Sequence, residues 1–520
     1  MKKYFLFLMF PFFLKGCYMK SPAAQSDDSL REKPNIIIFY VDDLGFADLS
    51  SYGAKGVNTP NVDVLVKGGL KLTDAHSSAA TCTPSRYSLL TGEYAFRNDA
   101  EILPGDAPLL IDTSKMTIPK MLGKAGYKSA VVGKWHLGLG NGNVDWNGTV
   151  SPGPLEIGFD YSFLLPATGD RVPTVYLENH EVLNLPKDDP IQVSYKENLG
   201  QERATKDNAR FISDKQHSET IVNGVGRIGA MVGGKNAYWK DEEFHTVFTD
   251  KANDFIEENK DSPFFLFFSF HDIHVPRLPN ERFLGQSEMG PRGDAIVQMD
   301  WITGQIMNKL RKLGIDQNTL VIFTSDNGPV LNDGYEDMAV EMLGNHNPAG
   351  PFKGGKYSAF EAGTRVPTIV YWPETVAPGE SDAMFSQVDL FASLSGIINV
   401  PVPASSAIDS EDLSRVLLGK SDKGRSVMLE ESYTLALRKD NWKYIMPLSP
   451  NKNIPAWMAN KGVETGLSHE PQLYNLEMDL NESVNVANDN PNLLLEMKAE
   501  LDLIINKTNS KEQIATMPSH

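Results

Sequence analysis

The chain of 520 residues is 41% hydrophobic and 22% charged, with 42 glycines and 32 prolines. This composition is typical of a large, loop-rich globular enzyme and excludes fibrous and disordered proteins. The formal net charge of −18 argues against a nucleic-acid-binding surface, so an anionic ligand would need a local group of cationic residues.

The N-terminus has the layout of a secretory signal. A basic start precedes an apolar run over residues 4–14, which is too short to span a bilayer comfortably. The Leu-Lys-Gly-Cys stretch that ends at Cys17 resembles a bacterial lipobox, with a lysine where a small uncharged residue is usual. We therefore expect a lipoprotein signal peptide over residues 1–16, lipidation at Cys17 and a tether over residues 17–33. The alternative is an ordinary signal peptide that is cut near Ala23 or Ala24.

This interpretation predicts an exported bacterial lipoprotein, periplasmic or on the cell surface, with the lipid as its only membrane anchor. The chain has two cysteines, Cys17 and Cys82. If Cys17 carries lipid, Cys82 has no partner within the chain, so Cys82 is either a buried apolar filler or a chemical site.

Beyond the signal, apolar runs separated by helical patterns predict buried parallel strands of an α/β sheet. In open α/β sheets the ligand binds beyond the carboxyl ends of the strands, so the residues that follow each run are candidates for one site. These residues, with the run before each, are Asp42 and Asp43 (35–41), Lys134 and His136 (129–133), His271 and His274 (263–270), and Asp326 and Asn327 (319–325). A fifth run over residues 366–372 follows a glycine-rich loop that contains Lys353 and Lys356.

Each of these groups also has an ordinary structural interpretation. Paired aspartates commonly cap helices, and Ser-Asp-Asn-Gly is typical of a turn. A single histidine is more often structural than catalytic, and lysines are usually solvated. His271 could orient His274 without touching a substrate.

Taken together, the residues favour metal-assisted chemistry on an ester. Four of them offer oxygen ligands, which favours Ca²⁺ or Mg²⁺ over zinc: Asp42, Asp43, Asp326 and Asn327. Next to such a cation, Lys134, Lys356 and Arg86 would clamp a tetrahedral oxyanion. Two histidines allow one to protonate a leaving oxygen and the other to handle a proton at the nucleophile. The residues therefore predict a hydrolase of sulfate or phosphate esters, with Cys82 as the nucleophile or its precursor.

The stretch Cys-Thr-Pro-Ser-Arg at residues 82–86, with Leu-Thr-Gly at 90–92, resembles the signature of type I sulfatases. In that family a maturation enzyme, which recognises the proline and the arginine, oxidises the cysteine to formylglycine. Further stretches similar to the family lie at residues 34–45, 126–138, 158–161, 324–329, 352–367 and 471–487. The resemblance covers roughly residues 34–490, with Ala362 where a glycine is common.

The resemblance implies a role for each matching residue. Hydrated formylglycine at position 82 attacks sulfur, with Ca²⁺ held by Asp42, Asp43, Asp326 and Asn327. Arg86 steadies the nucleophile, and Lys134 and Lys356 bind sulfate oxygens. His274 protonates the leaving group, and His136 removes a proton from the remaining hydroxyl so that sulfate leaves and the aldehyde returns.

The resemblance also implies an alkaline-phosphatase-like α/β fold with a large, mostly parallel mixed sheet between helices. We expect a catalytic domain over residues 34–425. A smaller C-terminal subdomain of antiparallel strands and a helix is expected over residues 426–520. An amphipathic pattern predicts its helix over residues 489–506.

Residues 167–182 and 345–367 resemble a subgroup of sulfatases that removes 6-O-sulfate from galactose or N-acetylgalactosamine. On that resemblance Asp170 and Arg171 would grip the hydroxyls of a sulfated carbohydrate, with His217 as a further candidate; a surface turn and a loop residue are the alternatives. We expect an exo-acting 6-O-sulfatase. The open alternatives are another regiospecificity, a phosphate or phosphonate ester hydrolase, an inactive glycan-binding lipoprotein, and a thiol-based redox or acyl-transfer enzyme.

Overall fold

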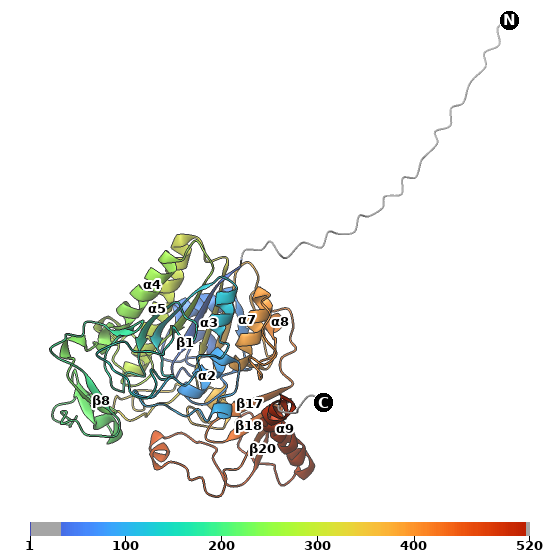
Figure 1. Ribbon diagram of the computed structural model, residues 1–520. Coiled ribbons are helices and arrows are strands. Elements are labelled where there is room, and N and C mark those ends of the chain that lie inside the picture. Colours follow the sequence, from blue (N-terminus) through green and yellow to red (C-terminus); the bar gives the residue numbers. More distant parts are fainter. Residues whose placement is uncertain (2–32, 516–520) are drawn as a thin grey trace. The chain divides into compact units, whose positions relative to one another are not determined.

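The computed structural model describes residue 1 and residues 33–515 (Figure 1). The predicted signal peptide and Cys17 therefore lie outside the described residues, as does most of the tether. Residues 34–515 belong to one compact unit. Among the described helices, none combines the length and the apolar composition needed to cross a bilayer.

A ten-stranded mixed sheet forms the centre of this unit, in the order β15-β2-β14-β13-β1-β12-β4-β5-β6-β7. Five central strands run parallel: β13 (Thr319–Ser325), β1 (Asn35–Val41), β12 (Phe264–Ser269), β4 (Lys128–Lys134) and β5 (Tyr161–Leu165). The flanking strands are β15 (Gly379–Ser381), β2 (Leu70–Leu72), β14 (Thr368–Tyr371), β6 (Leu177–Glu178) and β7 (Glu181–Val182). The mostly parallel mixed sheet that the family resemblance implies is confirmed.

The register of the central strands brings their carboxyl ends to one edge. Val41 of β1 pairs with Ser325 of β13, and Tyr40 pairs with Ser269 of β12. The fifth predicted strand differs from the others, because β14 runs antiparallel to β13. The loop before β14, which carries Lys356, therefore reaches the same edge as the loops that follow the parallel strands.

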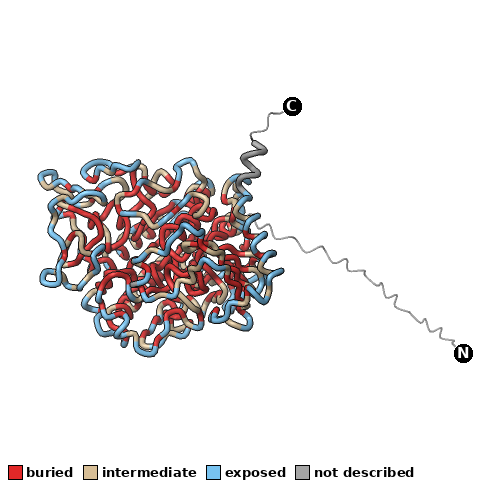
Figure 2. Tube along the Cα trace, turned by 90° about the horizontal axis from the view of Figure 1, so that it is seen from below, coloured by how far each residue is buried: buried red, intermediate tan, exposed pale blue. Residues whose placement is uncertain are grey.

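Alternate residues of β1 face two separate cores, which explains why its sequence is continuously apolar. One core contains residues of α2 (Cys82–Thr91), α3 (Ile118–Lys124) and α7 (Leu390–Ile398). The other contains residues of α1 (Pro60–Gly68), α4 (Phe244–Glu258) and α5 (Gly290–Leu313). Helices thus cover both faces of the sheet (Figure 1), and buried residues run through the interior of the trace (Figure 2).

The C-terminal part forms a smaller antiparallel sheet, as expected. Its strands are β17 (Val427–Glu431), β18 (Leu435–Lys439), β19 (Trp442–Ile445) and β20 (Gln472–Asn475). Helix α9 (Pro491–Ala515) packs on this sheet through Met497 and Leu501, so it begins two residues later and ends nine residues later than predicted. The division near residue 425 stays a prediction.

Short elements complete the fold. Two-stranded sheets are formed by β3 (Ala75–His76) with β16 (Phe385–Ser386), β8 (Gln192–Ser194) with β11 (Ala230–Val232), and β9 (Thr220–Val222) with β10 (Val225–Arg227). Two short α-helices are α6 (Glu361–Thr364) and α8 (Ser414–Leu417). The 3-10 helices are η2 (Ser50–Tyr52), η3 (Ala95–Asn98), η4 (Gln216–Ser218), η5 (Lys235–Ala237), η6 (Asp241–Glu243), η7 (Glu281–Phe283), η8 (Gln387–Asp389) and η9 (Ala456–Lys461).

Candidate active site

Cys82 is the first residue of α2, a helix whose ten residues are all buried. Thr81 precedes it in an extended conformation, and Gly92 ends the helix with a φ of 67°, which favours glycine. Burial raises the pKa of the Cys82 thiol well above its usual value. The unmodified thiol is therefore a weak nucleophile at neutral pH.

Three carboxylates converge on Cys82. One ligand atom each from Asp42, Asp43, Asp326 and Cys82 lies within 4.8 Å of the others. Asn327 donates its amide N–H to Asp43 Oδ1 at 2.7 Å, while its buried Oδ1 has no hydrogen-bond partner among the described residues. Three carboxylates and an unpaired amide oxygen fit a hard divalent cation.

Each carboxylate of this group has its own cation. Lys134 Nζ lies 2.7 Å from Asp42 Oδ2, and Lys356 Nζ lies 3.0 Å from Asp43 Oδ2. Arg86 donates to Asp326 Oδ2 from Nε at 3.0 Å and from Nη2 at 2.7 Å. All three cations are buried, so pairing offsets the large cost of burying charge.

The pKa values of the two adjacent aspartates shift in opposite directions. At each aspartate burial raises the pKa and the paired lysine lowers it, but the balance differs. For Asp43, burial outweighs Lys356 and raises the pKa to about 7. For Asp42, the effect of burial is overcome chiefly by Lys134, which helps to hold the pKa well below its usual value.

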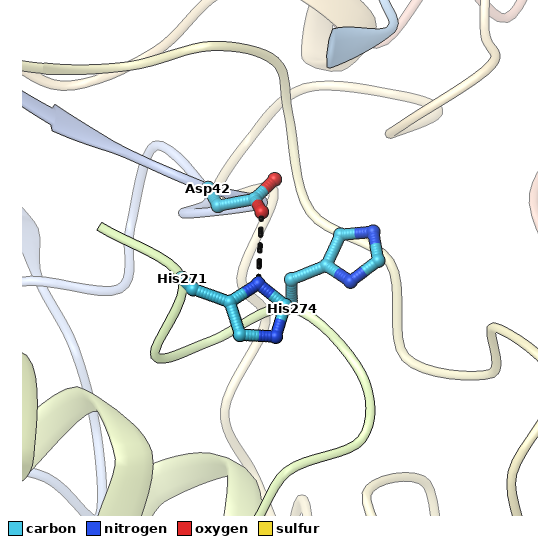
Figure 3. A group of neighbouring side chains, drawn as sticks. All are labelled: Asp42, His271 and His274. Carbon is cyan, nitrogen blue, oxygen red and sulfur yellow. Dashed lines mark ion pairs between the residues drawn. The ribbon is translucent and has the colours of Figure 1, made fainter. Parts of the chain in front are cut away.

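Three histidines surround this group. His271 accepts from the backbone N–H of Gly169 at Nε2, so its Nδ1 carries the proton and faces Asp42 Oδ2 at 3.6 Å (Figure 3). His274 donates from Nδ1 to the Val275 carbonyl at 2.7 Å, which leaves Nε2 unprotonated, 3.9 Å from Asp43 Oδ2. The ring centroids of His271 and His274 lie 5.3 Å apart.

The third histidine, His136, is hydrogen-bonded through Nε2 to the Leu103 carbonyl at 2.9 Å. Its Nδ1 is buried and has no hydrogen-bond partner in the described part of the chain. Burial lowers the pKa of both His136 and His274 well below the usual value, so both rings are neutral at pH 7.

Three non-glycine residues at the site have positive φ angles: Asp43 (60°), His136 (56°) and Tyr357 (74°). Such backbone conformations cost of the order of 1–3 kcal/mol each and tend to cluster at functional sites. The surrounding sheet and ion pairs hold these residues in place.

A cavity of about 660 Å³ opens beside Cys82. Seven of the predicted site residues line it: Cys82, His136, Asp170, Arg171, His217, His274 and Lys356. The other predicted catalytic and metal residues are fully buried and are not among the lining residues: Asp42, Asp43, Arg86, Lys134, Asp326 and Asn327. The structure therefore brings together all thirteen predicted residues of the described chain, with Lys134 held against Asp42. Lys353 lies outside this group, near Glu464 and Glu482.

Of the three predicted sugar-binding residues, Asp170 contacts the other two. Arg171 Nη1 lies 2.9 Å from Asp170 Oδ1, and His217 Nε2 lies 3.3 Å from Asp170 Oδ2. His217 Nδ1 lies 2.7 Å from Asp214. Despite burial, Arg171 and His217 hold the pKa of Asp170 well below its usual value. The cavity thus presents an ionised carboxylate next to a guanidinium group, which suits the recognition of neighbouring hydroxyls.

Asp333, which was not among the predicted site residues, is a second carboxylate that contacts Lys356. Lys356 Nζ lies 3.1 Å from Asp333 Oδ2, and Lys461 Nζ lies 2.8 Å from Asp333 Oδ1. The Tyr357 hydroxyl donates to the same carboxylate at 3.2 Å. Asp333 lies in a loop without an apolar run before it, so no pattern in the sequence pointed to it.

No pattern in the sequence indicated that residues after 430 line the cavity. We call this part of the lining the C-terminal wall; it consists of residues 431–435, 446–449, Lys452, Trp457 and Lys461. These residues run from the end of β17 to the start of β18 or lie between β19 and β20. Only their packing against the catalytic part places them at the site.

Comparison with known proteins agrees with this geometry. The family model described as Sulfatase matches residues 34–400. An N-acetylgalactosamine-6-O-sulfatase of Bacteroides thetaiotaomicron is 46% identical over 498 residues, which cover 94% of this chain and 96% of that protein. The steryl-sulfatase of Rattus norvegicus is 31% identical over 461 residues, covering 82% and 76% of the two chains.

Among solved structures, one from work on glycosaminoglycan metabolism by Bacteroides thetaiotaomicron has a TM-score of 0.89 at 46% identity. The match covers 91% of this chain and 99% of that chain. The family model, the relatives and the fold agree, and the chain belongs to the sulfatase family as a sulfuric ester hydrolase.

Proposed function

We propose that this sulfatase removes the 6-O-sulfate group from N-acetylgalactosamine or galactose at the end of a glycan chain. The observation that carries this proposal is the contact of Asp170 with both Arg171 and His217 in the cavity that Cys82 lines. An ionised carboxylate accepts from sugar hydroxyls, and the guanidinium donates to them. The similarity to an N-acetylgalactosamine-6-O-sulfatase supports the galacto configuration and the 6-position.

We propose further that Cys82 is converted to formylglycine and that Asp42, Asp43, Asp326 and Asn327 hold Ca²⁺. In that form the hydrated aldehyde supplies an oxygen nucleophile and calcium supplies positive charge for the transferred sulfate group. The convergence of three carboxylates and the unpaired Asn327 Oδ1 on position 82 supports this assignment. Because Cys82 and Arg86 are buried in the folded chain, a maturation enzyme would act on the chain before it folds.

The cationic residues would bind and orient the sulfate group. Lys356 lines the cavity, so its ammonium group can reach a sulfate oxygen while Asp333 and Asp43 hold it. Arg86 and Lys134 lie beneath the cavity, where they fix Asp326 and Asp42 and add positive charge at the reacting centre.

The hydrogen bonds of the two histidines support the proton-transfer roles that we propose for them. His274 presents Nε2 to the cavity side, since its Nδ1 is committed to the Val275 carbonyl. Because Nε2 is unprotonated in the substrate-free chain, His274 would take up a proton there when the anionic sulfate ester binds and would pass it to the leaving sugar oxygen. His136 has its Nε2 bonded to Leu103 and its Nδ1 free, so Nδ1 would accept the proton from the hydroxyl at position 82.

The N-terminal predictions also remain proposals, because residues 2–32 lie outside the described chain. We propose that Cys17 carries a lipid and that the protein is exported to the periplasm or the cell surface. The lipobox-like sequence supports this assignment. Mass spectrometry of the protein from its host, with and without a Cys17→Ser substitution, would test it.

A panel of singly sulfated sugars tests the catalytic proposal. The full chain, produced together with a formylglycine-generating enzyme, would be assayed for sulfate release from 6-, 4- and 3-sulfated galactose and N-acetylgalactosamine and from 6-sulfated N-acetylglucosamine. We expect release from the two 6-sulfated galacto sugars alone, and none by a Cys82→Ala variant. Release from another sugar would contradict the regiospecificity. No release by a chain whose position 82 is shown to be converted would contradict the substrate class.

A further inference from the structure

We propose that the cavity holds a second sugar ring, attached to the sulfated sugar, and that Trp457 and Tyr433 bind the apolar face of this ring. This inference rests on the proposed function, because it extends the same cavity from the sulfated sugar to its neighbour in the glycan. It adds a binding subsite that the C-terminal subdomain provides.

The lining of the cavity has two chemically different parts. Asp170, Arg171 and His217 provide charged hydrogen-bonding groups, whereas the C-terminal wall provides aromatic and aliphatic side chains. The latter include Tyr433, Leu435, Met446, Leu448 and Trp457. A pyranose ring carries hydroxyls around its rim and C–H groups on its faces. Aromatic rings suit such a face, and polar groups suit the rim.

Contacts between aromatic rings hold Trp457 in a defined orientation. Its ring centroid lies 5.0 Å from that of Tyr357 with an interplanar angle of 81°, and 6.1 Å from that of Tyr433 with an angle of 67°. Trp457 and Tyr433 are each half-buried, so part of each ring remains accessible. A preorganised aromatic surface binds at a low cost in conformational entropy.

Both aromatic residues also keep a polar atom available. In the described part of the chain, neither the Tyr433 hydroxyl nor the Trp457 indole N–H has a hydrogen-bond partner. Burial raises the pKa of Tyr433 to about 12, so its hydroxyl stays protonated and can donate. Exposed Lys452 lies beside them, with Nζ 2.7 Å from the Tyr433 carbonyl. These groups match the hydroxyls of a neutral sugar.

The aromatic surface is tied to the sulfate-binding end of the cavity. Helix η9 carries both Trp457 and Lys461, and Lys461 Nζ lies 2.8 Å from Asp333. Asp333 in turn holds Lys356 at 3.1 Å. A cavity of about 660 Å³ is large enough for a drug-sized ligand, which leaves room for a second ring beside the first.

The test compares two substrates: 6-O-sulfated N-acetylgalactosamine alone, and a disaccharide with that sugar at its non-reducing end. The full converted chain would be assayed with three variants, Trp457→Ala, Tyr433→Ala and Trp301→Ala. Trp301 is a half-buried tryptophan of α5 that stacks on Arg282 and is not among the residues that line the cavity. It therefore controls for the loss of a large aromatic side chain.

We expect the ratio of kcat/KM for the disaccharide to that for the monosaccharide to fall about three- to tenfold in the first two variants. The ratio should stay at its wild-type value in Trp301→Ala. A ratio that does not change in Trp457→Ala and Tyr433→Ala would overturn the subsite.

A binding experiment separates failure of the subsite from failure of the proposed function. If the wild-type chain releases sulfate from neither substrate, the proposed function fails. Calorimetric titration of the disaccharide into Cys82→Ser protein, with and without Trp457→Ala, then tests the subsite directly. Affinity at least threefold weaker in the double variant would support the subsite; equal affinity, or binding to neither protein, would overturn it.

Discussion

Glu431, at the end of β17, is a buried carboxyl group whose ionisation should weaken the fold. Its side chain is almost fully buried and accepts a hydrogen bond from the Phe96 N–H at 3.0 Å. Burial raises the pKa of Glu431 to about 8, although the backbone N–H groups of Phe96 and Ala95 oppose this shift. The group is therefore protonated in the folded chain at pH 7, whereas it is ionised in the unfolded chain.

The sign of the effect follows from this difference. A carboxyl whose pKa is raised on folding contributes stability that is fully present below the pKa of the unfolded chain and is lost as pH rises through about 8. Between pH 5 and pH 8 the loss is of the order of 3 kcal/mol. A Glu431→Gln variant keeps an acceptor for Phe96 without this loss, so it should gain stability relative to wild type as pH rises.

Thermal unfolding at pH 5, 6.5 and 8 measures this effect. The difference in Tm between Glu431→Gln and wild type should grow by a few degrees across this range. Glu336→Gln is the matched control, because it removes a carboxylate at an exposed position. A difference in Tm that is the same at all three pH values, or that grows equally in the control, would refute the reasoning.

The remaining predictions concern the reaction. Cys82→Ala should abolish sulfate release while the far-UV circular dichroism stays native, and substantial residual turnover would contradict a nucleophile at this position. Asp326→Asn should weaken calcium binding in calorimetry and lower kcat in parallel, because it removes one of three carboxylates; calcium-independent turnover would contradict the metal assignment. Arg171→Ala should lower kcat/KM for the sulfated sugar about 10- to 100-fold, since it removes charged hydrogen bonds to the ring. It should affect a small aryl sulfate much less, and equal losses on both would show that Arg171 does not bind the sugar.

The central part of the site could be predicted because each buried parallel strand is visible in the sequence as a continuous apolar run. Their residues are apolar on both faces, so a run such as Asn35–Val41 ends abruptly at Asp42. The register that pairs Val41 with Ser325 then brings residues from distant parts of the chain to one edge. The sequence could not predict which partners pair there, because the contact of Lys134 with Asp42 depends on side-chain geometry.

The residues of the C-terminal wall are not marked by any comparable pattern in the sequence. Trp457 and Lys461 lie in a short 3-10 helix within a connection between two strands. Asp333 lies in a loop, and its role emerges only from its distance to Lys356. Their place at the cavity follows from the packing of the two parts of the chain, which local patterns do not encode.

The residues proposed to act in catalysis and those proposed to select the sugar lie in different kinds of structural element. The former are fixed at the edge of the sheet, whereas Arg171, His217 and Trp457 come from loops and short elements that can vary without disturbing it. The two groups meet at Asp333, which lies 2.8 Å from Lys461 and 3.1 Å from Lys356. The Asp333 carboxylate thus joins η9, which carries Trp457, to Lys356 through two ion pairs. With the roles proposed above, Asp333 would link the selection of the sugar to the binding of the sulfate group.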